Sequence, residues 1–248
     1  MVAREGEEVG PSMGGSGARF RGRGHPVIDR GALVGAALVL LDEAGLEGLS
    51  MRRLADRLGV KAASLYWHVR NKEELLGLVA DEICAGVREP ETGLPWREKL
   101  EKLVRENRRV LVHHRDAARV LADTVPNGPN RLRLAEIMLG TLREAGFSRR
   151  DAVRAAFLLT DYATCFVAEE SRFTRAAEER SSSEEEDLAR ARRHFESLPR
   201  ETYPLAVELA GYLTDRDSEG RFAFGLRVLL DGLERELASR ASTGEPSG

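Results

Sequence analysis

From residue 27 onward, apolar residues recur at the spacing of helix faces, and this periodicity limits most strongly how the chain can fold. In nearly every segment they are three or four positions apart, which is the repeat of an amphipathic helix. No segment between turn residues alternates apolar and polar positions as a half-buried strand would. The sequence therefore predicts an all-α fold.

Near the amino end, the pattern predicts a compact module of short helices. An apolar stripe predicts a first helix over about 27–44, which Gly45 would end. Ser50 is a good N-cap for a second helix of about two turns, and Gly59 would stop it. A third short helix is expected over 61–67. Two short helices around a glycine-containing turn, held by a helix in front, are the outline of a helix-turn-helix.

The same module carries a charge unlike that of the whole chain. The chain has 38 Lys and Arg against 41 Asp and Glu, a formal charge of −3. Between Gly48 and Lys72, by contrast, six cations face one acid, Asp56; the cations are Arg52, Arg53, Arg57, Lys61, Arg70 and Lys72. A local excess of this kind attracts phosphates while the rest of the molecule is repelled by them. The module is therefore predicted to bind DNA.

A fourth helix and a connector follow this module. Asn71, with Glu74 three residues later, resembles the capping box that opens a helix. The two prolines within 88–95 forbid one continuous helix, so a domain boundary is expected there.

We therefore divide the chain into a DNA-binding domain at 26–88 and a C-terminal helical domain at 89–240. Flexible tails are expected at 1–25 and 241–248. The first tail ends in arginines that alternate with glycines and could follow phosphates or a minor groove. A merely solubilising tail is the alternative.

The C-terminal domain is predicted to contain several helices and one irregular segment. The segment at 171–200 loses the pattern and is predicted to be a solvated loop, although 185–197 could form a polar helix. Helices are expected over about 96–113, 116–123, 130–145, 149–170, 204–213 and 218–239.

Composition and motifs argue against several classes of protein. Cys84 and Cys165 are too few and too far apart for a disulfide framework or a metal site. No apolar run approaches the ~20 residues that span a bilayer, and no signal peptide is recognisable. The glycine-rich run at 14–17 lacks the strand and helix that flank a catalytic serine. We expect a cytoplasmic protein that is not an enzyme, contacts no membrane, and needs no cofactor and no metal.

Two stretches of the module, GLSMRRLADRLGV at 48–60 and SLYWHVRNKEELL at 64–76, resemble the DNA-binding domain of the TetR family. The C-terminal region is similar to the tetracycline-repressor subgroup at HRDAARV, 114–120, and at Gly-Phe-Ser, 146–148. The resemblance implies a homodimer that represses transcription until a small molecule enters its C-terminal domain. The alternative is an activator, or a regulator whose C-terminal domain binds a protein partner.

The third helix would lie in the major groove, where each base pair shows a distinct pattern of donors and acceptors. Ser64 and His68 could meet base edges or phosphates, although His68 could also be an ordinary surface residue. Leu65 and Trp67 are expected mainly to seat the helix on the domain. The candidates for DNA contact are Arg52, Lys61, Ser64, Tyr66, Trp67, His68 and Lys72.

Two segments offer a dimer interface. The segment at 149–170 is apolar on nearly all sides, too many for one buried stripe, and the last predicted helix has a leucine-rich stripe. The resemblance implies that both join the partner's copies in a four-helix bundle; the alternative is that they only close the monomer core. The candidates are Ala155, Leu159, Tyr162, Phe166, Leu226, Leu230 and Leu233.

Alignment with the tetracycline repressors places the effector near Arg88, Leu103, Asn107, Leu121, Thr124 and Glu169. Arg88 and Leu121 stand where the family has two ligand-binding histidines, so a magnesium–tetracycline complex is not expected. Arg88 would suit an anionic or carbonyl-bearing ligand, unless it is a plain surface arginine at the domain junction. The resemblance and the position of the fourth helix suggest that a ligand tilts this helix and so lowers operator affinity.

Overall fold

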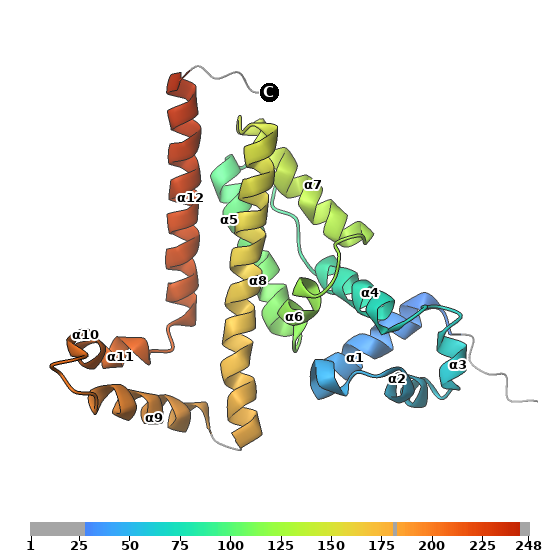
Figure 1. Ribbon diagram of the computed structural model, residues 1–248. Helices are drawn as coiled ribbons and strands as arrows, with labels where there is room; N and C mark the ends of the chain where they lie inside the picture. Colours follow the sequence, from blue (N-terminus) through green and yellow to red (C-terminus); the bar gives the residue numbers. More distant parts are fainter. Residues whose placement is uncertain (1–27, 181–182, 244–248) are drawn as a thin grey trace, which may run out of the picture.

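The computed structural model describes residues 28–180 and 183–243, and helices dominate both ranges (Figure 1). No strand occurs in these two ranges, so the all-α prediction is confirmed. None of the helices described is both long and apolar enough to cross a membrane. The helices are α1 (Arg30–Gly48), α2 (Met51–Leu58), α3 (Ala62–Leu65), α4 (Lys72–Ala85), α5 (Trp96–His113), α6 (Ala117–Ala122), α7 (Pro129–Glu144), α8 (Arg149–Arg180), α9 (Glu184–Glu196), α10 (Pro204–Glu208), α11 (Ala210–Leu213) and α12 (Ser218–Thr243).

Helices α1 to α3 form the predicted helix-turn-helix module, and their ends follow from the local sequence. The Ser50 hydroxyl accepts a hydrogen bond from the Arg53 amide and so caps α2. Gly59 ends α2 in the left-handed region, at φ 68°, which an L side chain would strain. Gly45, at φ 69°, breaks the end of α1 as predicted, although the helix resumes for one short turn. The predicted tail at 1–25 lies outside the described residues.

Helix α3 is shorter than predicted. The sequence predicts a helix over 61–67, but the helix ends at Leu65 and residues 66–68 form a turn. The amides of His68 and Val69 both donate to the Leu65 carbonyl, which tightens this end of the helix. Consequently Tyr66, Trp67 and His68 project from a turn beyond the helix.

Helix α4 joins the module to the C-terminal domain. At its start the Asn71 side chain accepts from the Glu74 amide, at 2.8 Å, as the capping box predicts. The Glu74 carboxylate, however, accepts from the Arg70 amide, so the reciprocal half of the box is missing. Along its length α4 packs on α1, α5, α6 and α7, and the expected connector at 88–95 separates it from α5.

In the C-terminal domain, α8 packs against α5, α6, α7 and α12. It runs to Arg180, so the prediction of a loop from 171 is wrong. Residues 171–180 show no apolar periodicity, but they are rich in Ala, Glu and Arg, which have high intrinsic helix propensity. The possible polar helix at 185–197 is present as α9, which Ser183 opens with a full capping box. Helices α9, α10 and α11 lie between the end of α8 and the start of α12 (Figure 1).

Helix α12 extends to Thr243, beyond the predicted helix end at 239 and into the predicted tail at 241–248, whose residues 244–248 lie outside the described part of the chain. An aromatic cluster fixes its first turns. The Tyr162 hydroxyl donates to the Phe222 carbonyl, at 2.9 Å, and the two rings stack with their centroids 5.2 Å apart. The Arg108 guanidinium also lies over the Phe222 ring, 4.7 Å from its centroid.

Gly225 allows this close approach, and Gly225→Ala tests it. A Cβ at Gly225 would lie 2.2 Å from the Tyr162 hydroxyl oxygen and under 3 Å from the ring, which Phe222 holds in place. We expect the substitution to lower the free energy of unfolding by about 1–3 kcal/mol, measured by denaturant titration. Gly232→Ala on the same helix is the control, because its Cβ would meet nothing within 4 Å. Equal effects of the two substitutions would contradict the packing argument.

Candidate functional site

The turn after α3 carries two exposed aromatic side chains. Tyr66 is 53% exposed and Trp67 is 88% exposed, whereas Leu65 is fully buried. Leu65 therefore seats α3 as predicted, but the expectation that Trp67 does so is wrong, because the turn directs its indole outward. A large apolar ring left in water at this position is available to a binding partner.

Four of the six cations in this module contact their own protein. Arg53 donates to the Gly48 carbonyl, at 2.9 Å, and Lys72 to the Leu46 carbonyl, at 3.3 Å. The other two form ion pairs, Arg57 with Glu43 and Arg70 with Glu74. Lys72, expected at the DNA, thus also ties the start of α4 to the end of α1.

Arg52 and Lys61 have a different environment from these four. Both are exposed, and neither side chain forms a hydrogen bond or an ion pair with any residue that the structure describes. Ser64 and His68 are half-buried beside the exposed turn. The structure thus places Arg52 on α2 and Lys61 just before α3, with their charges unneutralised.

The carboxylate of Asp116 joins the DNA-binding module to the C-terminal domain. The break at Gly45 frees the Leu46 amide, which donates to Asp116 Oδ2 at 2.9 Å. Arg175 of α8 donates to Asp116 Oδ1 at 2.8 Å, and Arg119 lies at 3.4 Å from the same oxygen. The Asp116 side chain is only 4% exposed, so these bonds compensate for the burial of its charge.

Asp42 and Glu47 extend this junction along α1. Asp42 accepts from the Arg115 amide, at 3.1 Å, and lies 3.0 Å from His114 Nδ1. Glu47 pairs with Arg119 at 2.8 Å, and this hydrogen bond lowers the pKa of Glu47. We name these contacts, from Asp42, Leu46 and Glu47 to the residues at 114–119 and Arg175, the α1 latch.

The far end of α4 is attached by side chains of α5 and α7. Arg109 donates to the Gly86 carbonyl, at 3.0 Å, and Arg133 to the Val87 carbonyl, at 3.3 Å. Buried Asp81 accepts from the Arg131 amide, at 2.9 Å, at the start of α7. Nearby, burial raises the pKa of the Cys84 thiol to about 11. Movement of α5 or α7 would therefore be transmitted to α4.

The six expected effector residues have different environments. Arg88 pairs with Glu106, at 2.7 Å, and Arg109 together with Arg88 lowers the pKa of Glu106 to about 2. Leu103 and Leu121 belong to the core, and Asn107 is half-buried. Thr124, finally, donates to the Val120 carbonyl and accepts from Arg131, and Glu169 pairs with Arg221.

A cavity of about 990 Å³ opens among α5, α8, α9 and the start of α12. Of the six expected residues, only Glu169 lines it. The sequence did not predict the cavity, because the C-terminal end of α8 and helix α9, which line much of it, fall in the segment at 171–200 that was predicted to be irregular. The cavity also borders the α1 latch through Asp42, His114, Asp116 and Arg175.

The candidate dimer residues divide into two groups. Ala155, Leu159, Leu226 and Leu230 are at most 2% exposed within the single subunit, because they face its core. Tyr162, Phe166 and Leu233 are half-buried. Among the side chains of α8 and α12 that the structure describes, the large apolar ones left in solvent are Val153, Phe157, Leu158, Phe224 and Val228.

The α1 latch gives a prediction for Asp116→Asn. Asparagine tolerates the positive φ of 56° at this position, so the substitution removes the charge with little added backbone strain. The Arg175 guanidinium would lose its anionic partner, and we expect the free energy of unfolding to fall by about 1–3 kcal/mol in chemical denaturation. Exposed Asp123→Asn is the control, with an expected change within about 0.5 kcal/mol. If Asp116→Asn left the free energy of unfolding unchanged, the charge of Asp116 in the α1 latch would contribute no stability.

Comparison with known proteins covers both parts of this architecture. Residues 33–79 match the family model "Bacterial regulatory proteins, tetR family", and residues 89–237 match "Tetracyclin repressor-like, C-terminal domain". An HTH-type transcriptional regulator of Saccharopolyspora erythraea is 42% identical over 60% of this chain and 64% of its own length. The class A tetracycline repressor from transposon 1721 of Escherichia coli is 35% identical over 87% of this chain and 95% of its own.

Among solved structures, the Streptomyces coelicolor TetR-family protein ActR in complex with actinorhodin matches with a TM-score of 0.74 and 36% identity, over 84% of this chain and 96% of that one. The relatives and the two domain matches agree on a DNA-binding regulator rather than an enzyme. The chain thus belongs to the TetR family of transcriptional regulators and has a C-terminal domain of the tetracycline-repressor type.

Proposed function

We propose that this protein is a homodimeric repressor that binds a two-fold symmetric operator and leaves it when a small molecule enters the C-terminal domain. The observation that carries the proposal is the exposed Tyr66–Trp67 turn on a module with an excess of cations. The family match and the ligand complex of ActR support the two other elements, operator binding and response to a ligand.

In this proposal α3 enters the major groove of the operator. Ala62 and Ala63 are small enough for close approach, and Ser64 and His68 supply hydrogen-bonding groups at base edges or phosphates. Tyr66 and Trp67 pack on the backbone at the end of the helix, while Arg52, Lys61 and Lys72 contact phosphates. Selection of operators from random DNA, followed by salt titration, tests this: a two-fold symmetric site and a steep salt dependence are expected.

Trp67→Ala tests the position of the turn. Because the indole is 88% exposed, its removal should leave thermal stability nearly unchanged. Operator affinity, measured by fluorescence anisotropy, should fall by at least about 10-fold, as for truncation of a buried interface tryptophan. Tyr212→Ala is the control, because this residue on α11 is 80% exposed but lies outside the module. Unchanged operator binding by Trp67→Ala would refute the proposed docking.

The dimer forms, in our proposal, through the outer sides of α8 and α12. On α8, Val153 and Phe157 are four residues apart and share one helix face; on α12, Phe224 and Val228 do the same. These helices lie against each other within the subunit, so their exposed apolar side chains suit a four-helix bundle with the partner's copies. Half-buried Tyr162, Phe166 and Leu233 remain candidates at the edges of this bundle. The other four candidates face the subunit core and act indirectly, because they position α8 and α12; they are Ala155, Leu159, Leu226 and Leu230.

The double substitution Phe157→Glu and Phe224→Glu tests this interface. Two carboxylates per subunit at an apolar contact carry a large desolvation penalty, so we expect a monomer in light scattering coupled to size exclusion. Operator affinity should fall with it, because two half-sites are no longer bound together. Leu132→Glu, at a half-exposed leucine of α7, is the matched control and should remain dimeric. A dimer that survives the double substitution would require another interface.

We propose that the effector binds near Leu103, Asn107, Leu121 and Thr124. Glu169, the remaining predicted contact besides Arg88, lines the cavity of about 990 Å³ described above. Arg88 is a weaker candidate, because Glu106 already engages its guanidinium. A ligand that displaces α5, α6 or α7 would act on α4 through the contacts of Asp81, Arg109 and Arg133. A coupling free energy of about 1–3 kcal/mol would suffice to release the operator at moderate ligand concentrations.

A further inference from the structure

The cavity among α5, α8, α9 and α12 has a lining that combines apolar and acidic side chains. Its apolar lining includes Val112, Val167, Leu188, Phe195 and Leu213. Its charged lining has six carboxylates against four guanidinium groups, so the lining is negative overall. A lining of this composition favours a ligand that combines an apolar body with a positive charge.

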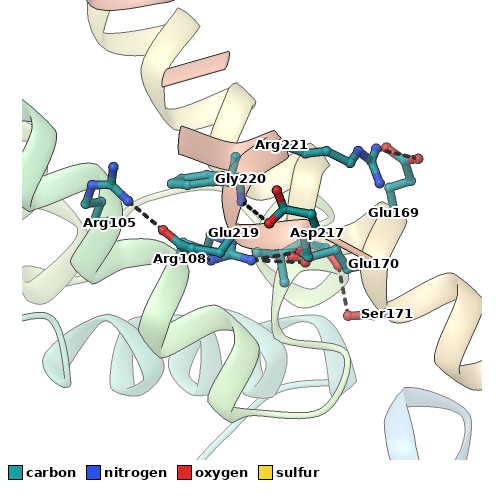
Figure 2. Close-up of polar contacts among 12 residues, drawn as sticks. Arg105, Arg108, Glu169, Glu170, Ser171, Asp217, Glu219, Gly220 and Arg221 are labelled. Carbon is teal, nitrogen blue, oxygen red and sulfur yellow. Dashed lines mark hydrogen bonds and ion pairs between the residues drawn. The ribbon is translucent and has the colours of Figure 1, made fainter. Parts of the chain in front are cut away.

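Glu170 supplies the most specific feature of the lining. Its Oε1 accepts from Arg108 Nη2 at 3.0 Å, at the place where Glu219 and Ser218 also hold Arg108 (Figure 2). Its Oε2 is buried and has no hydrogen-bond partner among the residues that the structure describes. A buried carboxylate oxygen without a donor is costly, and an N–H group from a ligand would remove this cost.

We propose that this cavity binds an organic cation with an apolar or aromatic body, whose ammonium group pairs with the Glu170 carboxylate and reaches the buried Oε2 when that carboxylate turns toward the cavity. The neighbouring acid Glu169 is already engaged by Arg221, at 3.4 Å, and is the weaker acceptor (Figure 2). The charge-assisted bond orients the ligand, and the apolar residues of α8 and α9 cover its body.

The location of the cavity gives the bound cation a route to the DNA-binding module. Asp42, His114, Asp116 and Arg175 line the cavity, and these residues also belong to the α1 latch. A positive charge at Glu170 in the same cavity attracts Asp116 and repels Arg175, which weakens the contact through which Asp116 links α1 to α8. The cation therefore alters operator affinity, a consequence that rests on the proposed function.

Three probes that share one fluorophore test the site on the full-length protein. Dansylcadaverine carries an ammonium group, dansylamide is neutral, and dansyl-6-aminohexanoate is anionic. In fluorescence titrations we expect one dansylcadaverine per subunit, bound at least about 10-fold more tightly than either other probe. Tighter or equal binding of the neutral or anionic probe would overturn the proposal.

Glu170→Gln should weaken dansylcadaverine by about 10-fold and leave dansylamide unchanged, because glutamine retains an acceptor for Arg108 but loses the charge. Exposed Glu136→Gln on α7 is the matched control and should change neither probe. Ala191→Trp fills the cavity from α9 without touching the carboxylate, so it should abolish binding of all three probes even if the Glu170 variant folds poorly. Unchanged affinity for dansylcadaverine in Glu170→Gln, or binding that survives Ala191→Trp, would refute the site.

Operator affinity with and without saturating dansylcadaverine separates the two proposals. A change that is lost in Glu170→Gln supports the coupling, whereas an unchanged operator affinity refutes the coupling and leaves the site standing. If the protein selects no operator, the proposed function fails, and the probe titrations still decide whether the cavity binds a cation.

Discussion

The arrangement of the two domains depends on one buried carboxylate. Asp116 can accept the Leu46 amide only because Gly45 interrupts α1 at this point, and it can face α1 only because its own backbone adopts a positive φ. A Cβ at Gly45 would lie 2.9 Å from Asp116 Oδ2, so neither residue tolerates much change. Arg175 of α8 donates to the same carboxylate. The two oxygens of Asp116, just before α6, thus join α1 and α8, which are distant in sequence.

This junction gives the DNA-binding module two attachments of different kinds. Helix α4 joins it to α5 and α7 through backbone carbonyls bound by arginines, whereas α1 joins it to α6 and α8 through carboxylates. Shifts of α5, α7 or α8 therefore reach the module by separate routes. Since removal of one partner from a buried ion pair is costly, the Asp116–Arg175 pair of the α1 attachment favours one discrete arrangement over continuous drift.

The sequence predicted those features that short-range chemistry determines. Ser50 and Gly59 mark the ends of α2 because capping involves only neighbouring residues. The predicted environment of Trp67 is wrong because α3 ends two residues earlier than expected, so the indole projects from a turn into solvent. Likewise, the segment at 149–170 is apolar on nearly all sides, so spacing cannot say which of its residues face the core; Leu159 does, and Phe157 does not. The cavity depends on segments at 171–200 that lack any period, and only tertiary structure brings them together.

The two cysteines occupy opposite chemical environments, and this makes the native chain convenient for spectroscopy. Cys84 is buried, and its raised pKa keeps the thiol protonated and unreactive near neutral pH. Cys165 is exposed, two helical turns beyond Phe157 on the same side of α8. A maleimide spin label would therefore attach to each chain at a single described position without any engineered mutation, and in the proposed dimer the distance between two such labels would report how the subunits are spaced.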